Sequence, residues 1–349
     1  MATEGPYIHL FSLHGLIRSK NLEMGRDADT GGQVKYVMEL GTGLSMRKDV
    51  GRVDLFTRLI DDKRVSSDYR QPVEVVNDKF RIVRIQCGGR KYLRKELLWP
   101  HLEEYVDKSI KFIKRHDAMP DVVHGHYPDA GHVAMQLAEI FGLPFVYTGH
   151  SLGRAKLARL LEQGMSEAEV DRRFKIDRRI AEEEKILARA DMVIASTRHE
   201  VANQYGLYDH KDVPEYKVIP PGIDIDTFYP FYHDMFDDAE RSENVRYAQA
   251  SMIKELNRFF IAPEKPLVLA LSRPDKRKNI DGLVHAYGED LELQSMANLA
   301  VFAGLRKDID AMGDNEREVL TRMLLAMDKY DLYGKMAIPK QHDFEYEVP

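Results

Sequence analysis

Short apolar runs that alternate with amphipathic helical patterns are the feature that most constrains the fold of this chain. The first apolar run, Tyr7–Leu13, precedes a helical pattern over Gln33–Met46. Further apolar runs continue the series: Asp121–Gly125, Phe145–Tyr147, Met192–Ser196 and Tyr216–Ile219. Helical patterns follow the first two of these, at Gly131–Phe141 and from about Ser151. Strands alternating with helices in this way predict an α/β fold with a parallel sheet covered on both faces.

The segment Pro220-Pro221-Gly222 interrupts this pattern, because two prolines and a glycine extend neither a helix nor a strand. A chain of 349 residues also exceeds the usual size of one domain. We therefore predict one domain over residues 1–225 and a second over 226–349. The second domain shows strand patterns at Leu267–Leu271, Leu299–Phe302 and Lys335–Ile338, with helical patterns at Tyr247–Phe260, Ile280–Gly288 and Glu316–Tyr330. These elements amount to about half of a doubly wound domain, so the second domain is predicted to be incomplete.

Composition excludes several classes of function. The net charge of −6 gives no electrostatic case for binding nucleic acid or an anionic membrane. Cys87 has no second cysteine with which to form an internal disulfide, and no apolar stretch reaches the roughly 20 residues that span a bilayer. The first residues also lack a secretory signal pattern. We expect a soluble, cytoplasmic protein.

The loop Gly25–Lys35 lies between the first strand and the first helix, and it is a candidate ligand site. Thr30, Gly31 and Gly32 form a turn that a ligand can approach closely, because glycine has no side chain and reaches conformations closed to other residues. The helix that begins near Gln33 presents unpaired N–H groups, which suit a phosphate or a sugar hydroxyl. An ordinary strand-to-helix connection explains the same residues equally well.

A basic loop, Ser272–Asn279, follows the strand Leu267–Leu271 and carries four cations within six positions. Ligands of open α/β sheets bind at the carboxyl ends of strands. Arg273 can hold two oxygens of a diphosphate in a fork, and Lys278 can add a point charge near the next helix start. The alternative is a solvated basic loop.

Two histidine-bearing strand ends are further candidates. In the stretch Thr148–Lys156, His150 can donate to a substrate hydroxyl and Ser151 can cap the following helix. The stretch His124–Tyr127 ends another strand, and its two histidines are too closely spaced, with too few acidic or sulfur partners, to indicate zinc. We predict no metal site.

The stretch Arg172–Glu184 carries a third cluster of cations. Lys175, Arg178 and Arg179 fall on one face of a helix by their spacing and could clamp a phosphate. The alternative is that the two arginines pair with Glu182 and Glu183 one turn later. A shorter basic loop over residues 88–95 ends at Lys95.

Together these segments resemble the sucrose-phosphate synthases, retaining glycosyltransferases with two Rossmann-like domains facing a cleft (the GT-B fold). The segments that carry the resemblance are Gly25-Arg26-Asp27, Asp29–Lys35, Leu98-Trp99-Pro100, Thr148–Gly153 with Lys156, and Leu271–Asn279. The resemblance implies transfer of glucose from UDP-glucose to fructose 6-phosphate, with no cofactor beyond the donor substrate. It also raises an association with sucrose-phosphate phosphatase.

The resemblance also implies a role for individual residues. His150, Arg273 and Lys278 would be catalytic, the last two by holding the donor diphosphate and stabilising the charge on the leaving group. The substrate-binding residues would be Gly31, Gly32, Gln33, Lys95, Tyr127, Ser151, Lys156, Arg178 and Arg179. Among these, the four cations are the candidates for binding the acceptor phosphate.

Several alternatives stay open at this point. Sucrose synthase uses free fructose and needs no phosphate clamp, while a GDP-mannose-using synthase would share the acceptor. An inactive fragment or a non-catalytic sugar-phosphate-binding module belongs to a different class, and we expect this chain to bind UDP-glucose poorly because the family's glutamate-bearing segment does not appear in it. A dinucleotide-dependent oxidoreductase would need a glycine fingerprint that the sequence lacks.

Overall fold

The computed structural model describes residues 5–23, 29–116, 118–223, 243–304 and 308–340. The chain divides into two compact units, Met1–Gly222 and Ile223–Pro349. The predicted domain boundary between residues 225 and 226 lies outside the described residues. Each unit is an α/β structure, in agreement with the predicted fold class.

The first unit is built on an eight-stranded sheet with the order β3-β4-β2-β1-β5-β6-β7-β8. Its strands are β1 (Tyr7–Phe11), β2 (Arg52–Arg58), β3 (Val73–Val75), β4 (Phe80–Ile85), β5 (Val122–His126), β6 (Phe145–Thr148), β7 (Met192–Ala195) and β8 (Glu215–Val218). All pairs are parallel except that of β3 with β4. Strand β1 pairs with β2 on one side and β5 on the other, so the chain changes direction across the sheet between β1 and β5. Ligands of such sheets bind beyond the carboxyl ends of the strands at this switch point.

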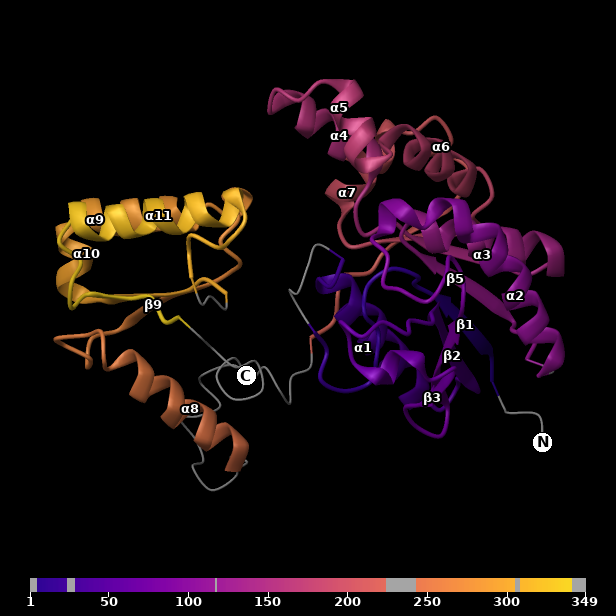
Figure 1. The fold of residues 1–349 in the computed structure, drawn as a ribbon, viewed down its shortest axis with the longest axis horizontal. Coiled ribbons are helices and arrows are strands. Elements are labelled where there is room, and N and C mark those ends of the chain that lie inside the picture. Colours follow the sequence, from indigo (N-terminus) through magenta and orange to yellow (C-terminus); the bar gives the residue numbers. More distant parts are fainter. Residues whose placement is uncertain (1–4, 24–28, 117, 224–242, 305–307, 341–349) are drawn as a thin grey trace. The chain divides into compact units, whose positions relative to one another are not determined.

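Helices cover both faces of this sheet (Figure 1). They are α1 (Gly32–Met46), α2 (Leu102–Arg115), α3 (Pro128–Phe141), α4 (Gly153–Glu162), α5 (Glu167–Phe174), α6 (Ile176–Leu187) and α7 (Arg198–Asn203). On one face Val37 of α1 packs with Leu10 and Leu55, while on the other Phe11 and Phe56 pack with α2 and α3. The alternation of side chains along each strand produces these two separate cores.

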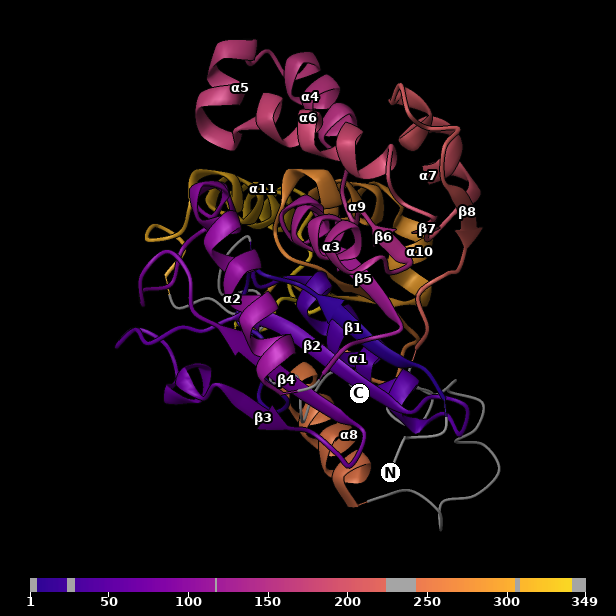
Figure 2. The ribbon, with the colours of Figure 1, turned by 90° about the vertical axis from the view of Figure 1, so that its right-hand side faces the viewer.

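Two predicted helices differ from the structure. The helix expected from about Ser151 begins at Gly153, with Leu152 as its N-cap. The cationic stretch predicted as one helix is divided between α5 and α6, because Lys175 adopts the left-handed conformation with φ 50°. Figure 2 shows α4, α5 and α6 grouped at one end of the unit.

The second unit has, among its described residues, a parallel sheet of three strands in the order β11-β10-β9. Its elements are α8 (Glu243–Leu256), β9 (Leu267–Leu271), α9 (Ile280–Glu289), α10 (Leu291–Met296), β10 (Asn298–Phe302), α11 (Asp314–Lys329) and β11 (Met336–Ala337). Val284 of α9 and Val319 of α11 pack on one face of the sheet, and Leu256 of α8 packs on the other. The last predicted strand, Lys335–Ile338, corresponds to β11, which is only two residues long.

Short 3-10 turns connect several of these elements. They are η1 (Ser67–Arg70), η2 (Lys95–Leu97), η3 (Trp99–His101), η4 (Tyr205–Leu207) and η6 (Lys276–Lys278). None of the helices in the described part of the chain combines the length and the apolar character needed to cross a membrane.

Candidate functional site

The start of α1 lies at the switch point of the first sheet. Gly31 is the N-cap of α1, and a Cβ atom built on Gly31 or Gly32 meets no described atom within 4 Å. Neither glycine has a positive φ, so the turn does not use the conformations that are closed to other residues, and the missing side chains alone leave room for a ligand. The Nε2 of Gln33 lies 3.2 Å from Ser12 Oγ, after β1, and 3.4 Å from the His126 carbonyl oxygen, at the end of β5. The helix start therefore leaves open space beside the carboxyl ends of both strands.

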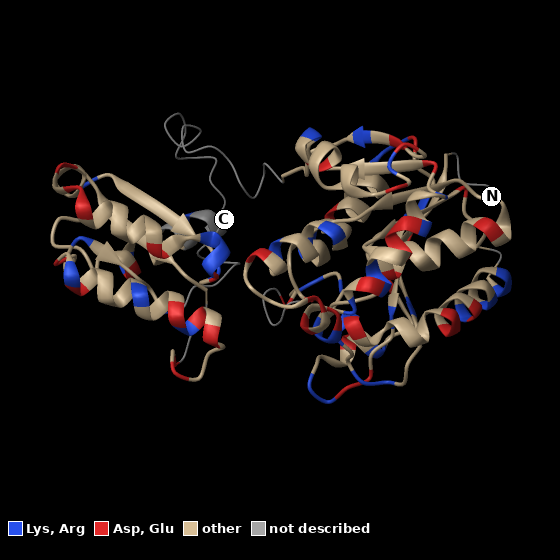
Figure 3. Cartoon of the chain, turned by 90° about the horizontal axis from the view of Figure 1, so that it is seen from above, with Lys and Arg blue, Asp and Glu red and all other residues tan. Residues whose placement is uncertain are grey.

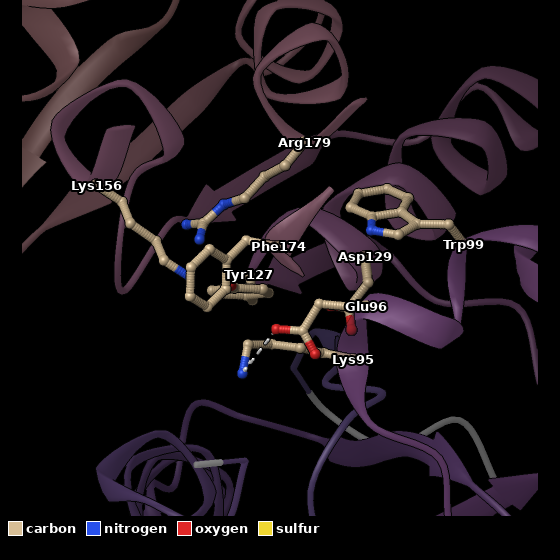
Figure 4. Close-up of a pocket in the computed structure, with 8 residues that line it drawn as sticks. All are labelled: Lys95, Glu96, Trp99, Tyr127, Asp129, Lys156, Phe174 and Arg179. Atoms are coloured by element: carbon tan, nitrogen blue, oxygen red, sulfur yellow. Dashed lines mark ion pairs between the residues drawn. The ribbon is translucent and has the colours of Figure 1, made fainter. Parts of the chain in front are cut away.

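A small pocket beside this edge of the sheet gathers most of the predicted cations of the first unit (Figure 4). It is lined by Lys95, Glu96, Trp99, Tyr127, Asp129, Lys156, Phe174 and Arg179. Lys95 comes from η2, Lys156 from α4 and Arg179 from α6, which are far apart in the sequence. Three of the four cations predicted to bind a phosphate thus lie around one pocket.

Arg179 is buried, and its guanidinium is held on three sides. Its Nε donates to Glu183 Oε1 at 2.9 Å, its Nη2 donates to the Ser151 carbonyl oxygen, and its Cζ lies 4.5 Å from the centroid of the Tyr127 ring. Burial alone would lower the pKa of Arg179, but the charge of Glu183, its hydrogen bond and the neighbouring tyrosines together hold that pKa above its ordinary value. The remaining nitrogen, Nη1, makes no hydrogen bond to a described residue. The head group is therefore charged, fixed in place and left with free donors.

Lys156 provides a second charge whose ionisation is sensitive to its surroundings. Its Nζ lies 3.7 Å from the centroid of the Phe174 ring, a cation–π contact. Burial, followed by the charges of Arg179 and Lys95, lowers the pKa of Lys156 to about 8. An anion bound between these cations would reverse the electrostatic part of this shift.

The third cation, Lys95, is accompanied by carboxylates. It forms an ion pair with Asp29, whose Oδ2 also accepts from the Lys95 backbone N–H at 2.9 Å. Burial alone would raise the pKa of the Asp29 carboxyl, but His14 and Lys95 bring it below its ordinary value. Asp129 lines the pocket as well, and its Oδ2 lies 2.9 Å from His14 Nδ1. The pocket therefore combines cations for a phosphate with carboxylates able to accept from hydroxyl groups.

Two predictions about this region are wrong. Lys175, Arg178 and Arg179 do not share a face, since Arg179 is buried while the other two are exposed and Lys175 precedes the helix. Arg178 lies outside the pocket lining, with its Cζ 5.4 Å from the centroid of the Trp99 ring.

Ser151 is not a helix cap, because the N-cap of α4 is Leu152, which makes no side-chain cap bond. Ser151 instead offers its carbonyl oxygen to Arg179.

The alternative reading of Arg179 is also confirmed, since it pairs with Glu183 one turn later. Arg178 does not pair with Glu182, which binds His132 and Lys185 instead. Arg179 lines the pocket and Arg178 does not, because Arg179 lies on the buried side of α6.

His150 lies in the loop after β6, at the same edge of the sheet. Its backbone is left-handed, with φ 57°, and its Nε2 lies 3.0 Å from His126 Nδ1. Burial, with a smaller effect of His14, lowers the pKa of His150 to about 3, so the ring is neutral at physiological pH. When His126 Nδ1 is the donor of this pair, His150 carries its own proton on Nδ1 and can donate it to a hydroxyl group.

Tyr127 and the loop of the second unit complete the set of predicted residues. The Tyr127 ring lies against the guanidinium of Arg179, and burial raises the pKa of the Tyr127 hydroxyl.

Two cations of the basic loop in the second unit are paired. In η6, Lys276 pairs with Glu318 at 2.6 Å and Arg277 pairs with Asp275. Figure 3 shows in blue and red where basic and acidic residues lie along the elements of each unit.

The remaining cations of that loop differ from their neighbours. The side chains of Arg273 and Lys278 are exposed, and no described residue forms an ion pair with either of them. Arg273 lies just after β9, at its carboxyl end, and Lys278 is the last residue of η6. Among the described residues the other two cations of the loop are paired and these two are not, while anion binding by Arg273 and Lys278 stays a prediction.

Comparison with known proteins identifies the family. The Glycosyltransferase Family 4 profile matches residues 30–227, more than half of the chain. The chain belongs to Glycosyltransferase Family 4. This family 4 chain is 43% identical to the sucrose-phosphate synthase of Zea mays, over 98% of its own length and 37% of the relative. It is 41% identical to a probable sucrose-phosphate synthase 2 of Arabidopsis thaliana, over 98% of this chain and 37% of the relative.

Solved structures agree with the family assignment. The sucrose-phosphate synthase of Thermosynechococcus elongatus matches with a TM-score of 0.66 and 26% identity, over 98% of this chain and 72% of that one. The catalytic domain of starch synthase IV from Arabidopsis thaliana matches with a TM-score of 0.58 and 14% identity, over 98% of this chain and 75% of that one, which shows the shared fold. The predicted GT-B fold class and the resemblance to sucrose-phosphate synthases are confirmed. The chain spans a little over a third of the plant relatives.

Several residues around the pocket of this family 4 glycosyltransferase were not predicted from the sequence. Phe174, Glu96 and Asp129 line the pocket without having been named as candidates. Trp99 belongs to Leu98-Trp99-Pro100, one of the segments that carry the family resemblance, so its place at the site could have been predicted from the sequence. Glu183 appeared in the sequence only as a pairing partner of arginine.

Proposed function

We propose that the chain carries out the glucosyl transfer of a sucrose-phosphate synthase, from UDP-glucose to fructose 6-phosphate, giving sucrose 6-phosphate and UDP with retention at the transferred carbon. The observation that carries this proposal is the pocket in which Lys95, Lys156 and Arg179 meet. The similarity to sucrose-phosphate synthases at 40–43% identity supports it.

The pocket suits the phosphate of a phosphorylated sugar. Arg179 offers Nη1 and Lys156 offers its ammonium, two charge-assisted donors of the kind that phosphate oxygens prefer. Free fructose would bring no anion to Nη1 of Arg179 or to Lys156. This argues against sucrose synthase, whose acceptor carries no phosphate.

Arg273 and Lys278 are the proposed ligands of the donor diphosphate. During the reaction the bond between the glucose carbon and the UDP oxygen breaks, and a bond from the acceptor hydroxyl oxygen to that carbon forms. The acceptor proton passes to an oxygen of the leaving phosphate, on the same face of the sugar. Cations at the diphosphate stabilise the negative charge that develops there.

Further parts of the proposal concern the residues around the donor sugar and the setting of the enzyme. His150 would donate to a hydroxyl of the glucose, and Gly31, Gly32 and Gln33 would lie against the reacting sugars in the open space at the start of α1. No cofactor beyond the donor substrate is required. A cytoplasmic location and an association with sucrose-phosphate phosphatase belong to the same proposal.

Isothermal titration of the chain with fructose 6-phosphate and with fructose tests the acceptor site. We expect a Kd of about 1 mM or tighter for fructose 6-phosphate and no measurable binding of fructose. Lys156→Met should weaken the first interaction about tenfold, because a charge-assisted contact is lost. Lys175→Met is the matched control, since Lys175 is an exposed lysine next to the pocket elements and does not line the pocket. Equal binding of both sugars, or of neither, would contradict the proposal.

A further inference from the structure

Glu183 is a buried carboxylate on α6 that accepts from three different segments of the chain. Its exposed fraction is 0%. Oε1 accepts from Arg179 Nε at 2.9 Å, and Oε2 accepts from the backbone N–H of Gly153 at 2.9 Å and from the Tyr208 hydroxyl. A buried charge is stable only when its hydrogen bonds are satisfied, so this arrangement has one well-defined geometry.

We infer that Glu183 is the positioning residue of the acceptor-phosphate pocket, setting the places of both Arg179 and Lys156. This inference rests on the proposed function, because it assumes that these two cations bind the phosphate. Glu183 itself does not line the pocket and would not touch the ligand.

The first part of the argument concerns Arg179. Glu183 engages Nε and the Ser151 carbonyl engages Nη2, so the guanidinium plane has no freedom to turn about its long axis. Nη1 is then the nitrogen that remains for a ligand, and Figure 4 shows the head group directed toward the side of the pocket where Lys156 lies. Without the Glu183 carboxylate, the Arg179 side chain would be able to rotate or to form an ion pair with another carboxylate.

The second part concerns Lys156, which lies three residues after Gly153 in the first turn of α4. The N-cap Leu152 has no side-chain acceptor, so the free N–H groups of this helix start need other partners. Glu183 accepts from the N–H of Gly153, and the Tyr208 hydroxyl accepts from the N–H of Arg154 at 3.1 Å. A carboxylate at the positive end of a helix is also electrostatically favourable.

The glycine at position 153 belongs to this arrangement. A Cβ atom there would lie 2.7 Å from Glu183 Oε2 and 2.8 Å from Ile180 Cγ1. The carboxylate can therefore reach the backbone of α4 only because residue 153 has no side chain. One carboxylate thus joins α4, which carries Lys156, to α6, which carries Arg179.

Glu183→Gln tests the inference with little change of shape. The amide nitrogen would replace one of two acceptor oxygens and would face a donor, either Arg179 Nε or the pair formed by Gly153 and Tyr208. We expect the Kd for fructose 6-phosphate to rise about tenfold, as for loss of one partner of a buried charge pair. Tyr208→Phe removes one donor to the carboxylate and should raise the Kd about threefold.

Glu182→Gln is the matched control. Glu182 precedes Glu183 on the same helix, but its carboxylate binds His132 and Lys185. Its replacement should leave the Kd for fructose 6-phosphate within about twofold. Thermal unfolding of each variant shows whether the fold is retained.

A double-mutant cycle separates positioning from general stability. In an Arg179→Met background, Glu183→Gln should change the Kd by less than about threefold, because the side chain that it orients is absent and the effect through Lys156 is all that remains. An equal loss in both backgrounds, or no loss from Glu183→Gln and Tyr208→Phe, overturns the inference. If the unaltered chain fails to bind fructose 6-phosphate, the proposed function itself fails and the inference falls with it.

Discussion

Binding of fructose 6-phosphate should weaken as the pH rises through 8, because Lys156 loses its proton there. Burial and the charges of Arg179 and Lys95 bring the pKa of Lys156 to about 8 in the free protein. A phosphate dianion in contact would raise that pKa by about 1–3 units, since an opposite charge favours the protonated form. Ligand binding therefore favours proton uptake, and affinity is fully present below the free pKa and lost above it.

The magnitude follows from the two protonation states. At pH 7 about nine-tenths of the free Lys156 is protonated, and at pH 9 about one-tenth. The Kd should therefore rise about five- to tenfold between these values. The sugar phosphate itself is close to doubly charged over this range, because its second pKa is about 6. Tyr127, which faces the same pocket, stays protonated because burial raises the pKa of its hydroxyl.

Isothermal titration at pH 7, 8 and 9 measures this dependence. Repeating the titration at pH 8 in buffers of different ionisation enthalpy should reveal uptake of about half a proton per bound ligand. Lys156→Arg is the matched control, because arginine stays charged throughout this range and should give a nearly flat profile. A wild-type Kd that changes less than about twofold, or the same slope in Lys156→Arg, would refute the reasoning.

Three further predictions follow from single positions. Gly153→Ala should lower the melting temperature by several degrees (roughly 2–4 °C per kcal/mol for a unit of this size) and weaken fructose 6-phosphate binding, because its Cβ would displace Glu183. Gly43→Ala on α1, whose Cβ meets no described atom within 4 Å, is the control: it should leave binding nearly unchanged and should not lower the melting temperature, because alanine favours a helix more than glycine does. Arg273→Met should weaken UDP-glucose binding about tenfold in a titration, whereas Lys276→Met, which removes a cation already paired with Glu318, should change it less than about twofold. Cys87 is buried, and burial raises the pKa of its thiol to about 11, so a thiol reagent at pH 8 should label it only after the protein is unfolded with denaturant; rapid labelling of the folded chain would contradict this.

Much of the fold could be predicted from the pattern of apolar residues. Strands β1 and β5 to β11 and helices α1, α3, α9 and α11 lie within a few residues of their predicted ranges, whereas β2, β3 and β4 had none. This succeeds because a parallel strand that is buried on both faces must be apolar along its length. The predicted cations also proved informative, since strand ends of a parallel sheet bring loops together at one edge.

The selection among neighbouring cations could not be made in the same way. Arg178 and Arg179 are adjacent in sequence, and one lies against Trp99 while the other is buried beside Tyr127. The break at Lys175 rotates α6 relative to α5, and a left-handed lysine has no clear signal in the sequence. In the second unit, Asp275 and Glu318 form ion pairs with two cations of the basic loop. Arg273 and Lys278 form no ion pair with a described residue.

By itself, the sequence determined the α/β architecture and the segments able to meet an anion, because both depend on residue types and their local order. The tertiary structure alone decided which charges converge, which are already paired and which carboxylate holds them. Glu183 is the plainest case. Its contacts reach from α6 to residues 153 and 208, and such contacts depend on burial and on the approach of distant backbone rather than on any neighbour in the chain.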